Sequence, residues 1–228
     1  IDAAPTPHSC YTMSPQLLSA SAAAGLESGY LSYHSQESQE EEDLLISGSG
    51  AMYENRKRSG MSTPPVTGES SLKYFIDRMA AVKSAPYDEH ILLVHNVCLK
   101  QDDIDAAKRV MNNVYWAICP LSNIFIHNAL PPVPLMRENG LAITVGTDSL
   151  SSNDDLDMVK ELVCIKHNFP EVPMNEILVW ACLNGARFLS KEMQLGSLAP
   201  GKTPGIVFVS GVDEDGSFTY ESRSERII

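Results

Sequence analysis

Residues 141–149 read Leu-Ala-Ile-Thr-Val-Gly-Thr-Asp-Ser, an apolar strand-like run that breaks off at Asp148. Two other apolar runs also end at a polar side chain, one at His34 and one at His95. In a parallel α/β barrel the carboxyl ends of the strands carry the groups that handle substrates and metals, so these side chains are expected at one edge of a sheet. Two imidazoles and a carboxylate at that edge suggest a metal-assisted hydrolytic site, and zinc suits this ligand set.

The bulk composition is that of a folded, acidic protein. A chain of 228 residues with 43% hydrophobic content is long enough for one large domain or two small ones with a packed core. The net charge of −12 and the pI near 4.8 argue against nucleic acid or an anionic membrane as a partner, because both would repel the protein. A small neutral or cationic ligand is the expected partner.

The sequence predicts neither a membrane segment nor an export signal. No apolar run approaches the roughly 20 residues that cross a bilayer, and residues 1–15 lack a basic stretch followed by an apolar one. The five cysteines are odd in number and scattered, without a Cys-x-x-Cys pair, which argues against a disulfide framework and against a cysteine zinc site. These features predict a cytoplasmic protein.

Strand-like and helix-like runs alternate through most of the chain, as in parallel β/α units. Ser14 is the expected N-cap of the first helix, with Pro15 at its first position. Residues 47–69 are rich in Gly, Ser and Pro and are interpreted as a connector that covers the mouth of a barrel. The strands are expected to end near residues 34, 95, 119 and 147, and the helices to span residues 15–26, 38–46, 70–82, 101–111, 155–167 and 175–189, with a short one that ends at residue 138.

The two ends of the chain depart from this alternation. Residues 1–5 are interpreted as the end of a strand inside a longer protein, since no initiator Met is present. The last two helices have no strand between them, residues 195–202 and 206–209 are predicted to be short strands, and Asp215-Gly216 is predicted to be a hairpin turn. We therefore expect an α/β fold in two parts. Residues 1–190 form a partial hydrolase barrel, about strands four to eight, and residues 191–228 form part of a small β-sandwich appendage.

Glu37 is a further candidate for the site. It lies three residues after His34, which would place it on the opposite face of a continuing strand. The polar residues 35–36 and the helix start at Ser38 predict a turn that brings both side chains to one substrate. A carboxylic acid beside the nucleophile can pass protons to a ring nitrogen or a leaving amine. Taken alone, Glu37 would be a helix-start acid, and the acidic run 39–43 is interpreted as a solvated face at the positive end of a helix dipole.

Six short motifs give a specific resemblance when they are taken together. Each is weak alone, but they occur in the order found in the amidohydrolase superfamily and cover nearly the whole chain. The sequence most resembles the branch that holds chlorohydrolases, guanine deaminase and the methylthioadenosine/S-adenosylhomocysteine deaminases. The motifs are Pro7-His8-Ser9-Cys10-Tyr11-Thr12, His34-x-x-Glu37, Val94-His95-Asn96-Val97, Cys119-Pro120-Leu121-Ser122-Asn123, Gly146-Thr147-Asp148-Ser149 with Ser152-Asn153, and Asn184-Gly185-Ala186.

The resemblance implies a role for each candidate residue. His34 would be a metal ligand at the end of the fifth barrel strand, and Asp148 would be a ligand and proton acceptor at the eighth. His95, at the sixth strand, would polarise or hydrogen-bond the attacking water. Glu37 would protonate the ring nitrogen next to the carbon under attack, and His8 would contact the substrate. The expected cofactor is one divalent metal ion, zinc or iron.

The sequence also departs from the family pattern. Such proteins carry a His-x-His pair at the end of the first barrel strand, and no His-x-His occurs here; His90, His127 and His167 lack the needed spacing. The resemblance therefore implies that roughly the first half of the barrel, with the partner strands of the appendage, is absent from this chain. Catalytic zinc takes three protein ligands, so this chain alone is expected to bind metal weakly or not at all. The family's Ala-Asp after Gly-Lys is replaced by Thr203-Pro204-Gly205.

These features predict a metal-dependent hydrolase that acts on a C–N bond. The full-length form would deaminate an aminated purine or nucleoside-like heterocycle by attack of metal-bound hydroxide, and this chain alone would be inactive. Two alternatives remain: a hydrolytic dechlorinase or another specificity on the same scaffold, and a non-catalytic binding or assembly module that has lost the metal. An open half-barrel would leave strand edges and an apolar face uncovered, so a homo-oligomer or completion by further chain is expected.

Overall fold

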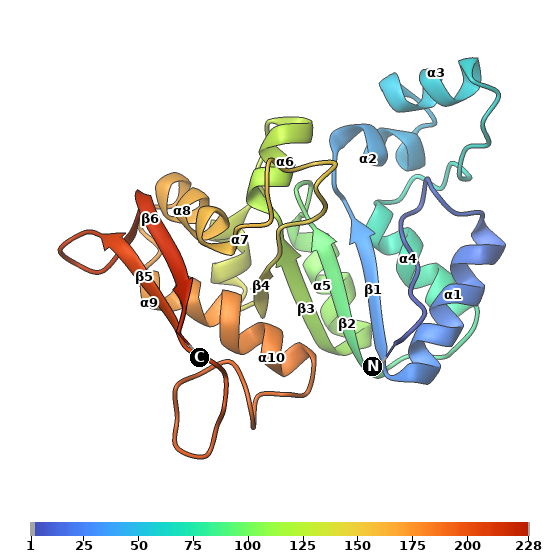
Figure 1. The fold of residues 1–228 in the computed structure, drawn as a ribbon. Helices are drawn as coiled ribbons and strands as arrows, with labels where there is room; N and C mark the ends of the chain where they lie inside the picture. Colours follow the sequence, from blue (N-terminus) through green and yellow to red (C-terminus); the bar gives the residue numbers. More distant parts are fainter. Residues whose placement is uncertain (1–2, 228) are drawn as a thin grey trace.

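The computed structural model describes residues 3–227 (Figure 1). A sheet of four strands forms its centre: β1 (Tyr30–Ser35), β2 (Tyr87–His95), β3 (Met111–Ile118) and β4 (Ile143–Val145). All neighbours pair in parallel, and the spatial order follows the chain order. This is the predicted α/β arrangement of successive β/α units, and the carboxyl ends of all four strands lie at one edge of the sheet.

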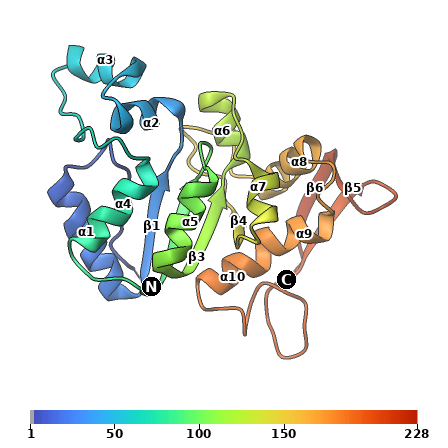
Figure 2. The same cartoon turned by 180° about the vertical axis from the view of Figure 1, so that it is seen from behind.

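Helices α1 (Pro15–Ser28), α4 (Ser71–Ala80) and α5 (Gln101–Val110) pack beside this sheet. Figure 2 shows α5 lying across the face that Figure 1 hides. The predicted start of α1 is correct, since the Ser14 side chain accepts a hydrogen bond from Leu17 N. The core between helices and sheet is apolar, and its largest side chains include Trp116 and the stacked rings of Tyr33 and Phe75, whose centroids lie 4.1 Å apart.

Residues 3–8 run beside β1 without forming the expected strand; residues 1–2 of that prediction lie outside the described part of the chain. Ser32 N donates to the Thr6 hydroxyl at 2.7 Å, and His34 N donates to the His8 carbonyl at 2.8 Å. Pro5 and Pro7 lack an amide hydrogen, so this segment cannot form a regular strand ladder. It still fixes His8 next to the end of β1.

Three further differences concern the carboxyl edge. The connector contains a helix, α3 (Gly50–Arg58). The Cys-Pro motif continues into a second helix that was not predicted, α6 (Pro120–His127). Helix α2 (Gln39–Ile46) begins as predicted, at the Ser38 cap. Its acidic run is not a solvated face throughout, because Glu41 and Glu42 are buried. Glu41 accepts hydrogen bonds from the backbone amides of the turn after β1, and Glu42 accepts one from Ser71 N.

Helix α7 (Val133–Glu138) precedes β4, and helix α8 (Met158–Asn168) follows it. The helix predicted over 175–189 is observed as α9 (Met174–Leu178), the π-helix η1 (Val179–Asn184) and α10 (Gly185–Phe188) in succession. The Asn184 side chain donates to Ile143 O at 2.7 Å and so ties this helix to β4.

A two-stranded antiparallel hairpin, β5 (Val207–Val212) and β6 (Phe218–Arg226), follows at the C-terminus and packs along α8. Its turn is at the predicted Asp215-Gly216. Residues 195–202, predicted to be a strand, form turns and bends instead. The boundary between parts at residue 190 stays a prediction. Among residues 3–227, no helix is long and apolar enough to cross a membrane.

Candidate active site

His34, His95 and Asp148 meet at the carboxyl edge of the sheet. Each offers a ligand atom, and these three atoms all lie within 4.8 Å of one another. The parallel register produces this meeting: His34 and Ser35 pair with Val94 and His95 across β1 and β2, and Asp148 follows β4 by three residues. Residues that are 114 positions apart along the chain, from 34 to 148, are thus brought to one point.

The backbone at these strand ends is unusual. His95, Asn96 and Asp148 have φ values of 75°, 58° and 58°, and Gln36 has a φ of 53°. A non-glycine residue in this left-handed region costs on the order of 1–3 kcal/mol, so the surrounding structure must hold it there. The Asn96 side chain does so by donating to Leu93 O at 2.8 Å and to Ala117 O at 3.2 Å. The left-handed residues turn the chain out of each strand and aim the side chains at the common point.

The His34 ring is prepared for a metal ion. Its Nδ1 lies 3.2 Å from the His8 carbonyl, which can only accept, so Nδ1 carries the proton and Nε2 keeps a free lone pair. Burial and the nearby His95 ring lower the pKa of His34, which favours the neutral form that binds metal. His8 stacks on His34 at 4.4 Å between centroids, and the His8 Nδ1 lies 2.9 Å from the Thr12 hydroxyl.

His95 is oriented as a hydrogen-bond donor. The Asn123 side-chain amide donates to its Nδ1 at 3.1 Å, so the proton of the neutral ring lies on Nε2. That Nε2 is 3.7 Å from Glu37 Oε1. His95 is fully buried, and burial lowers its pKa and keeps the ring neutral. With Nε2 protonated, His95 can donate to an attacking oxygen, whereas His34 Nε2 is left to coordinate.

Asp148 stays ionised. Its Oδ2 accepts hydrogen bonds from the hydroxyls of Ser122 at 2.7 Å and Ser152 at 2.6 Å. Burial would raise the pKa of Asp148, but the two hydroxyls, with the nearby imidazoles of His95 and His34, outweigh it, and the pKa lies below its ordinary value. The carboxylate is therefore charged at neutral pH and suited to bind a cation.

Glu37 faces the same site because the chain turns after β1. Its backbone amide and that of Gln36 both donate to the carboxylate of Glu41, at 2.8 and 3.3 Å. The Glu37 side chain then places Oε2 3.0 Å from the Tyr11 hydroxyl, which donates to it. Burial raises the pKa of Glu41 to about 7.

A second buried acid, Glu161 on α8, joins the loops that carry the site. Its carboxylate accepts from Leu121 N at 2.9 Å and from the Asn153 side chain at 2.7 Å. Asn153 also donates to Thr147 O at 2.9 Å, one residue before Asp148. The loop after β3 and the loop after β4 are thus fixed to each other through one carboxylate.

Several of these contacts were not foreseen from the sequence. Tyr11, Ser122 and Asn123 lie in the quoted motifs without a predicted role, and for His127 the sequence shows only that it lacks the His-x-His spacing. For Ser122, Asn123 and His127 the available signal is the polar spacing within residues 122–127, where 123 and 127 lie one helical turn apart; no such signal points to Tyr11. His90 lies elsewhere, with its Nδ1 2.6 Å from Phe188 O.

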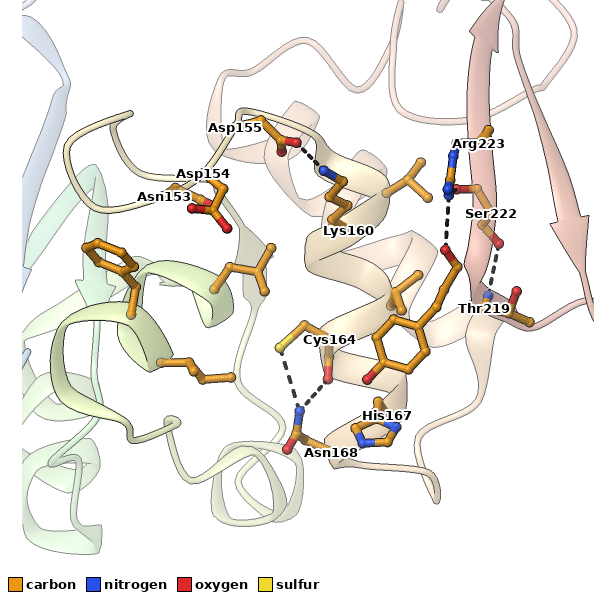
Figure 3. A pocket seen from close by; sticks show the side chains of 16 residues that line it. Asn153, Asp154, Asp155, Lys160, Cys164, His167, Asn168, Thr219, Ser222 and Arg223 are labelled. Carbon is orange, nitrogen blue, oxygen red and sulfur yellow. Dashed lines mark hydrogen bonds and ion pairs between the residues drawn. The ribbon is translucent and has the colours of Figure 1, made fainter.

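A cavity of about 550 Å³ lies beside this site, between α6, α8 and β6. Figure 3 shows Lys160 of α8 directed at Asp155 and Cys164 directed at Asn168, with Thr219, Ser222 and Arg223 on the hairpin beside this helix. The residues that line it include neither imidazole of the cluster nor Asp148. It is therefore separate from the candidate active site, although Asn153 contributes to both.

His34 and Asp148 could bind a divalent metal ion, but they do not complete its coordination. His34 Nε2 and the Asp148 carboxylate are ligands of the kind that zinc prefers, and both are held by neighbours. His95 lies close enough to be a third ligand, but its protonated Nε2 makes it a donor. Two ligands are fewer than the three of a catalytic zinc site.

Comparison with known proteins identifies the family. The Amidohydrolase family matches residues 1–228, the whole chain. The chain belongs to the amidohydrolase family. A 5-methylthioadenosine/S-adenosylhomocysteine deaminase of Moorella thermoacetica is 36% identical over 129 residues, which are 54% of this chain and 30% of that protein. A 5'-deoxyadenosine deaminase of Methanobrevibacter smithii is 29% identical over 126 residues, 52% of this chain and 28% of that protein. The predicted family and its deaminase branch are confirmed.

Solved deaminase structures share the fold. Helicobacter pylori aminofutalosine deaminase in complex with methylthio-coformycin aligns with a TM-score of 0.73 and 26% identity, over 88% of this chain and 48% of that one. A zinc-bound adenosine deaminase of Xanthomonas campestris aligns with a TM-score of 0.62 at 20% identity, over 90% of this chain and 42% of that one. The predicted fold, part of a (β/α)8 barrel, is thereby confirmed. This amidohydrolase chain covers about half the length of these solved structures, and its matched part covers under a third of the length of the curated relatives.

Proposed function

We propose that the protein hydrolytically deaminates an aminated heterocycle of the purine nucleoside class, as a metal-dependent amidohydrolase. The observation that carries this proposal is the convergence of His34, His95 and Asp148 within 4.8 Å, with the Glu37 carboxylate 3.7 Å from His95 Nε2. Two relatives are named as deaminases of methylthioadenosine and S-adenosylhomocysteine or of 5'-deoxyadenosine, which supports a nucleoside without a 5'-phosphate. The net charge of −12 also disfavours a phosphorylated substrate.

Each residue has a proposed role in this reaction. When bound to His34 and Asp148, a divalent ion, zinc or iron, would lower the pKa of a water and supply a nucleophile at neutral pH. Asp148 accepts a proton from the attacking water, and the His95 Nε2 hydrogen donates to the attacking oxygen. Glu37 protonates the ring nitrogen beside the carbon under attack. Water adds to the ring carbon, Asp148 passes the proton it accepted to the exocyclic amine, the C–N bond breaks, and ammonia leaves. The remaining hydroxyl proton returns to Glu37 as the carbonyl forms, and the ring nitrogen keeps the proton that Glu37 gave it.

His8 is proposed to contact the substrate, since it stacks on His34 while its ring stays partly exposed at the site. Glu37 and His95 together favour an aromatic amine, because attack at such a carbon requires protonation of the neighbouring ring nitrogen. A hydrolytic dechlorinase would use the same nucleophile on the same scaffold and remains an alternative within the enzyme class.

A non-catalytic binding module is the second candidate, favoured by the count of two available metal ligands. We infer that this chain alone is inactive and that the longer protein supplies the remaining ligands. The cytoplasm is the proposed location on the cysteine pattern, and the five thiols are all free in the structure.

The activity test is ammonia release by the longest natural protein that contains residues 1–228, loaded with zinc, from methylthioadenosine, S-adenosylhomocysteine and 5'-deoxyadenosine. Asp148→Asn should lower kcat by at least about 100-fold, because the neutral amide is a poor ligand and proton acceptor. Asp154→Asn, an exposed acid in the same loop, is the matched control and should keep kcat. Full activity in Asp148→Asn would overturn the assignment.

Metal content separates the two candidates. Residues 1–228 alone should retain well under one zinc per chain after gel filtration, and the longer protein should retain one, measured by inductively coupled plasma mass spectrometry. A longer protein that holds no metal and hydrolyses none of the three nucleosides would favour the binding module.

A further inference from the structure

One helix, α6, supports three of the four residues at the site. Its Ser122 hydroxyl donates to Asp148, and its Asn123 amide donates to His95 Nδ1. His127, the last residue of the helix, places its Nε2 3.8 Å from Glu37 Oε1. Asn123 and His127 lie four residues apart and so share one helix face. Ser122 and Asn123 orient the side chains of Asp148 and His95, and His127 occupies the corresponding place beside Glu37.

The Glu37 carboxylate has a fixed oxygen and a free one. Oε2 accepts the hydrogen bond of the Tyr11 hydroxyl. Oε1 lies between two imidazole nitrogens, His95 Nε2 at 3.7 Å and His127 Nε2 at 3.8 Å. Both distances are a few tenths of an ångström beyond hydrogen-bond length. Oε1 is therefore the oxygen left to exchange a proton with a substrate in the proposed reaction, and both imidazole nitrogens lie within 4 Å of it.

The end of α6 directs His127 inward. Asn128 adopts a left-handed conformation with a φ of 48°, and its amide donates to Ile124 O, so the helix stops directly after His127. The His127 side chain is 20% exposed. Its neighbours Phe125 and Ile126 are 65% and 44% exposed.

We propose that His127 is a positioning residue that acts through Glu37. Together with Tyr11 it holds the carboxyl group so that Oε1 faces the reacting ring, and it restricts rotation of the Glu37 side chain toward solvent. This inference rests on the proposed role of Glu37 in deamination. A plain alternative is that His127 serves only the C-terminus of α6, where a basic group interacts favourably with the helix dipole.

Three variants of the zinc-loaded longest natural protein distinguish these readings. His127→Leu removes the N–H group at similar volume, His127→Gln restores an N–H donor, and Phe125→Leu is the control on the exposed face of the same helix. Misplacing a reacting group by about 1 Å can cost about 100-fold in rate. His127→Leu should therefore lower kcat about 10- to 100-fold with KM changed less than about 3-fold, and His127→Gln should recover most of the loss.

The opposite results would overturn the proposal. One is a kcat of His127→Leu within about 2-fold of the wild-type kcat, and another is a rise in the KM of His127→Leu alone. A third is an equal loss of kcat in His127→Leu and His127→Gln together with an equal fall in their Tm. Phe125→Leu should leave kcat, KM and Tm unchanged, which excludes a general effect of altering α6.

A second measurement keeps the test valid if the wild-type protein deaminates nothing. The 13C resonance of the Glu37 side-chain carboxyl, assigned through its loss in Glu37→Gln, reports the surroundings of that group without any turnover. It should move in His127→Leu and stay in place in Phe125→Leu. An unmoved resonance in His127→Leu would refute the contact, whereas an inactive wild type with a moved resonance would refute only the proposed function.

Discussion

At the scale of single residues, Glu161 shows how burial gives one carboxyl group a pH-dependent effect. Burial raises its pKa from 4.5 to about 7, although Leu121 N and the Asn153 amide both donate to it. An acid with a raised folded-state pKa contributes stability that is complete below its unfolded pKa and is lost as the pH rises through the folded value. The free energy of unfolding should therefore fall between about pH 4.5 and pH 8, by up to about 3 kcal/mol.

Urea unfolding at half-unit pH steps measures this slope. Glu161→Gln should be less stable at low pH and should lose the part of the decline that Glu161 contributes, because the amide does not titrate, whereas Glu41, whose pKa burial also raises to about 7, keeps its part. Glu171→Gln, at an exposed acid after the same helix, should keep the wild-type slope. If the free energy of unfolding of Glu161→Gln fell with pH as steeply as that of the wild type, Glu161 would not be a source of the pH dependence.

The residue scale also shows where sequence reasoning succeeds and stops. His34, His95 and Asp148 could be found because each follows an apolar run, a pattern that strand geometry makes readable. Glu41 and Glu42 could not, since an acidic helix start reads as solvated. Their burial depends on backbone amides that need an acceptor, those of the turn after β1 for Glu41 and that of Ser71 for Glu42, and this need exists only in the folded chain.

At the scale of elements, the loop after α10 packs against η1 through a glycine. Gly196 has a φ of +81°, and a Cβ there would lie 2.8 Å from Ala186 Cβ and 2.9 Å from Leu183 Cα. Gly196→Ala should destabilise the protein by about 2–4 kcal/mol, because backbone strain and overpacking add. Gly29 also has a positive φ, +85°, but nothing within 4 Å, so Gly29→Ala should cost only about 1 kcal/mol.

Thermal and urea unfolding of the two alanine variants tests this pair. Equal losses of stability in the two variants would mean that the backbone conformation alone sets the cost and that the loop at Gly196 moves to accept the methyl group.

Helix α6 shows at the same scale why a short helix is not predicted from the sequence. Pro120 begins it and Asn128 ends it, but eight residues give too short a periodic signal to separate a helix from a turn.

At the scale of the whole molecule, the terminal hairpin exposes an apolar surface. Val207, Phe208 and Tyr220 are 58%, 56% and 67% exposed. A two-stranded sheet is marginally stable by itself, and open strand edges favour pairing between chains. Residues 1–228 should therefore self-associate at micromolar concentration, with a light-scattering mass that rises above the 24.9 kDa of one chain.

Phe208→Lys should shift this association to higher concentration, because a charge would be buried on pairing. Val66→Lys, at an exposed apolar position in the connector, is the control and should leave the mass curve unchanged. A constant mass of one chain up to several hundred micromolar would refute the expectation.

The sequence by itself determined the alternation of strands and helices, the polar residue at each strand end, the hairpin turn and the family, because all of these depend on local periodicity or on short motifs in order. Only the tertiary structure decided which tautomers His34 and His95 take, which acids are buried, and that α6 reaches the site at Asp148, His95 and Glu37. Those features depend on hydrogen bonds between residues far apart in the chain, and no local pattern encodes such distances.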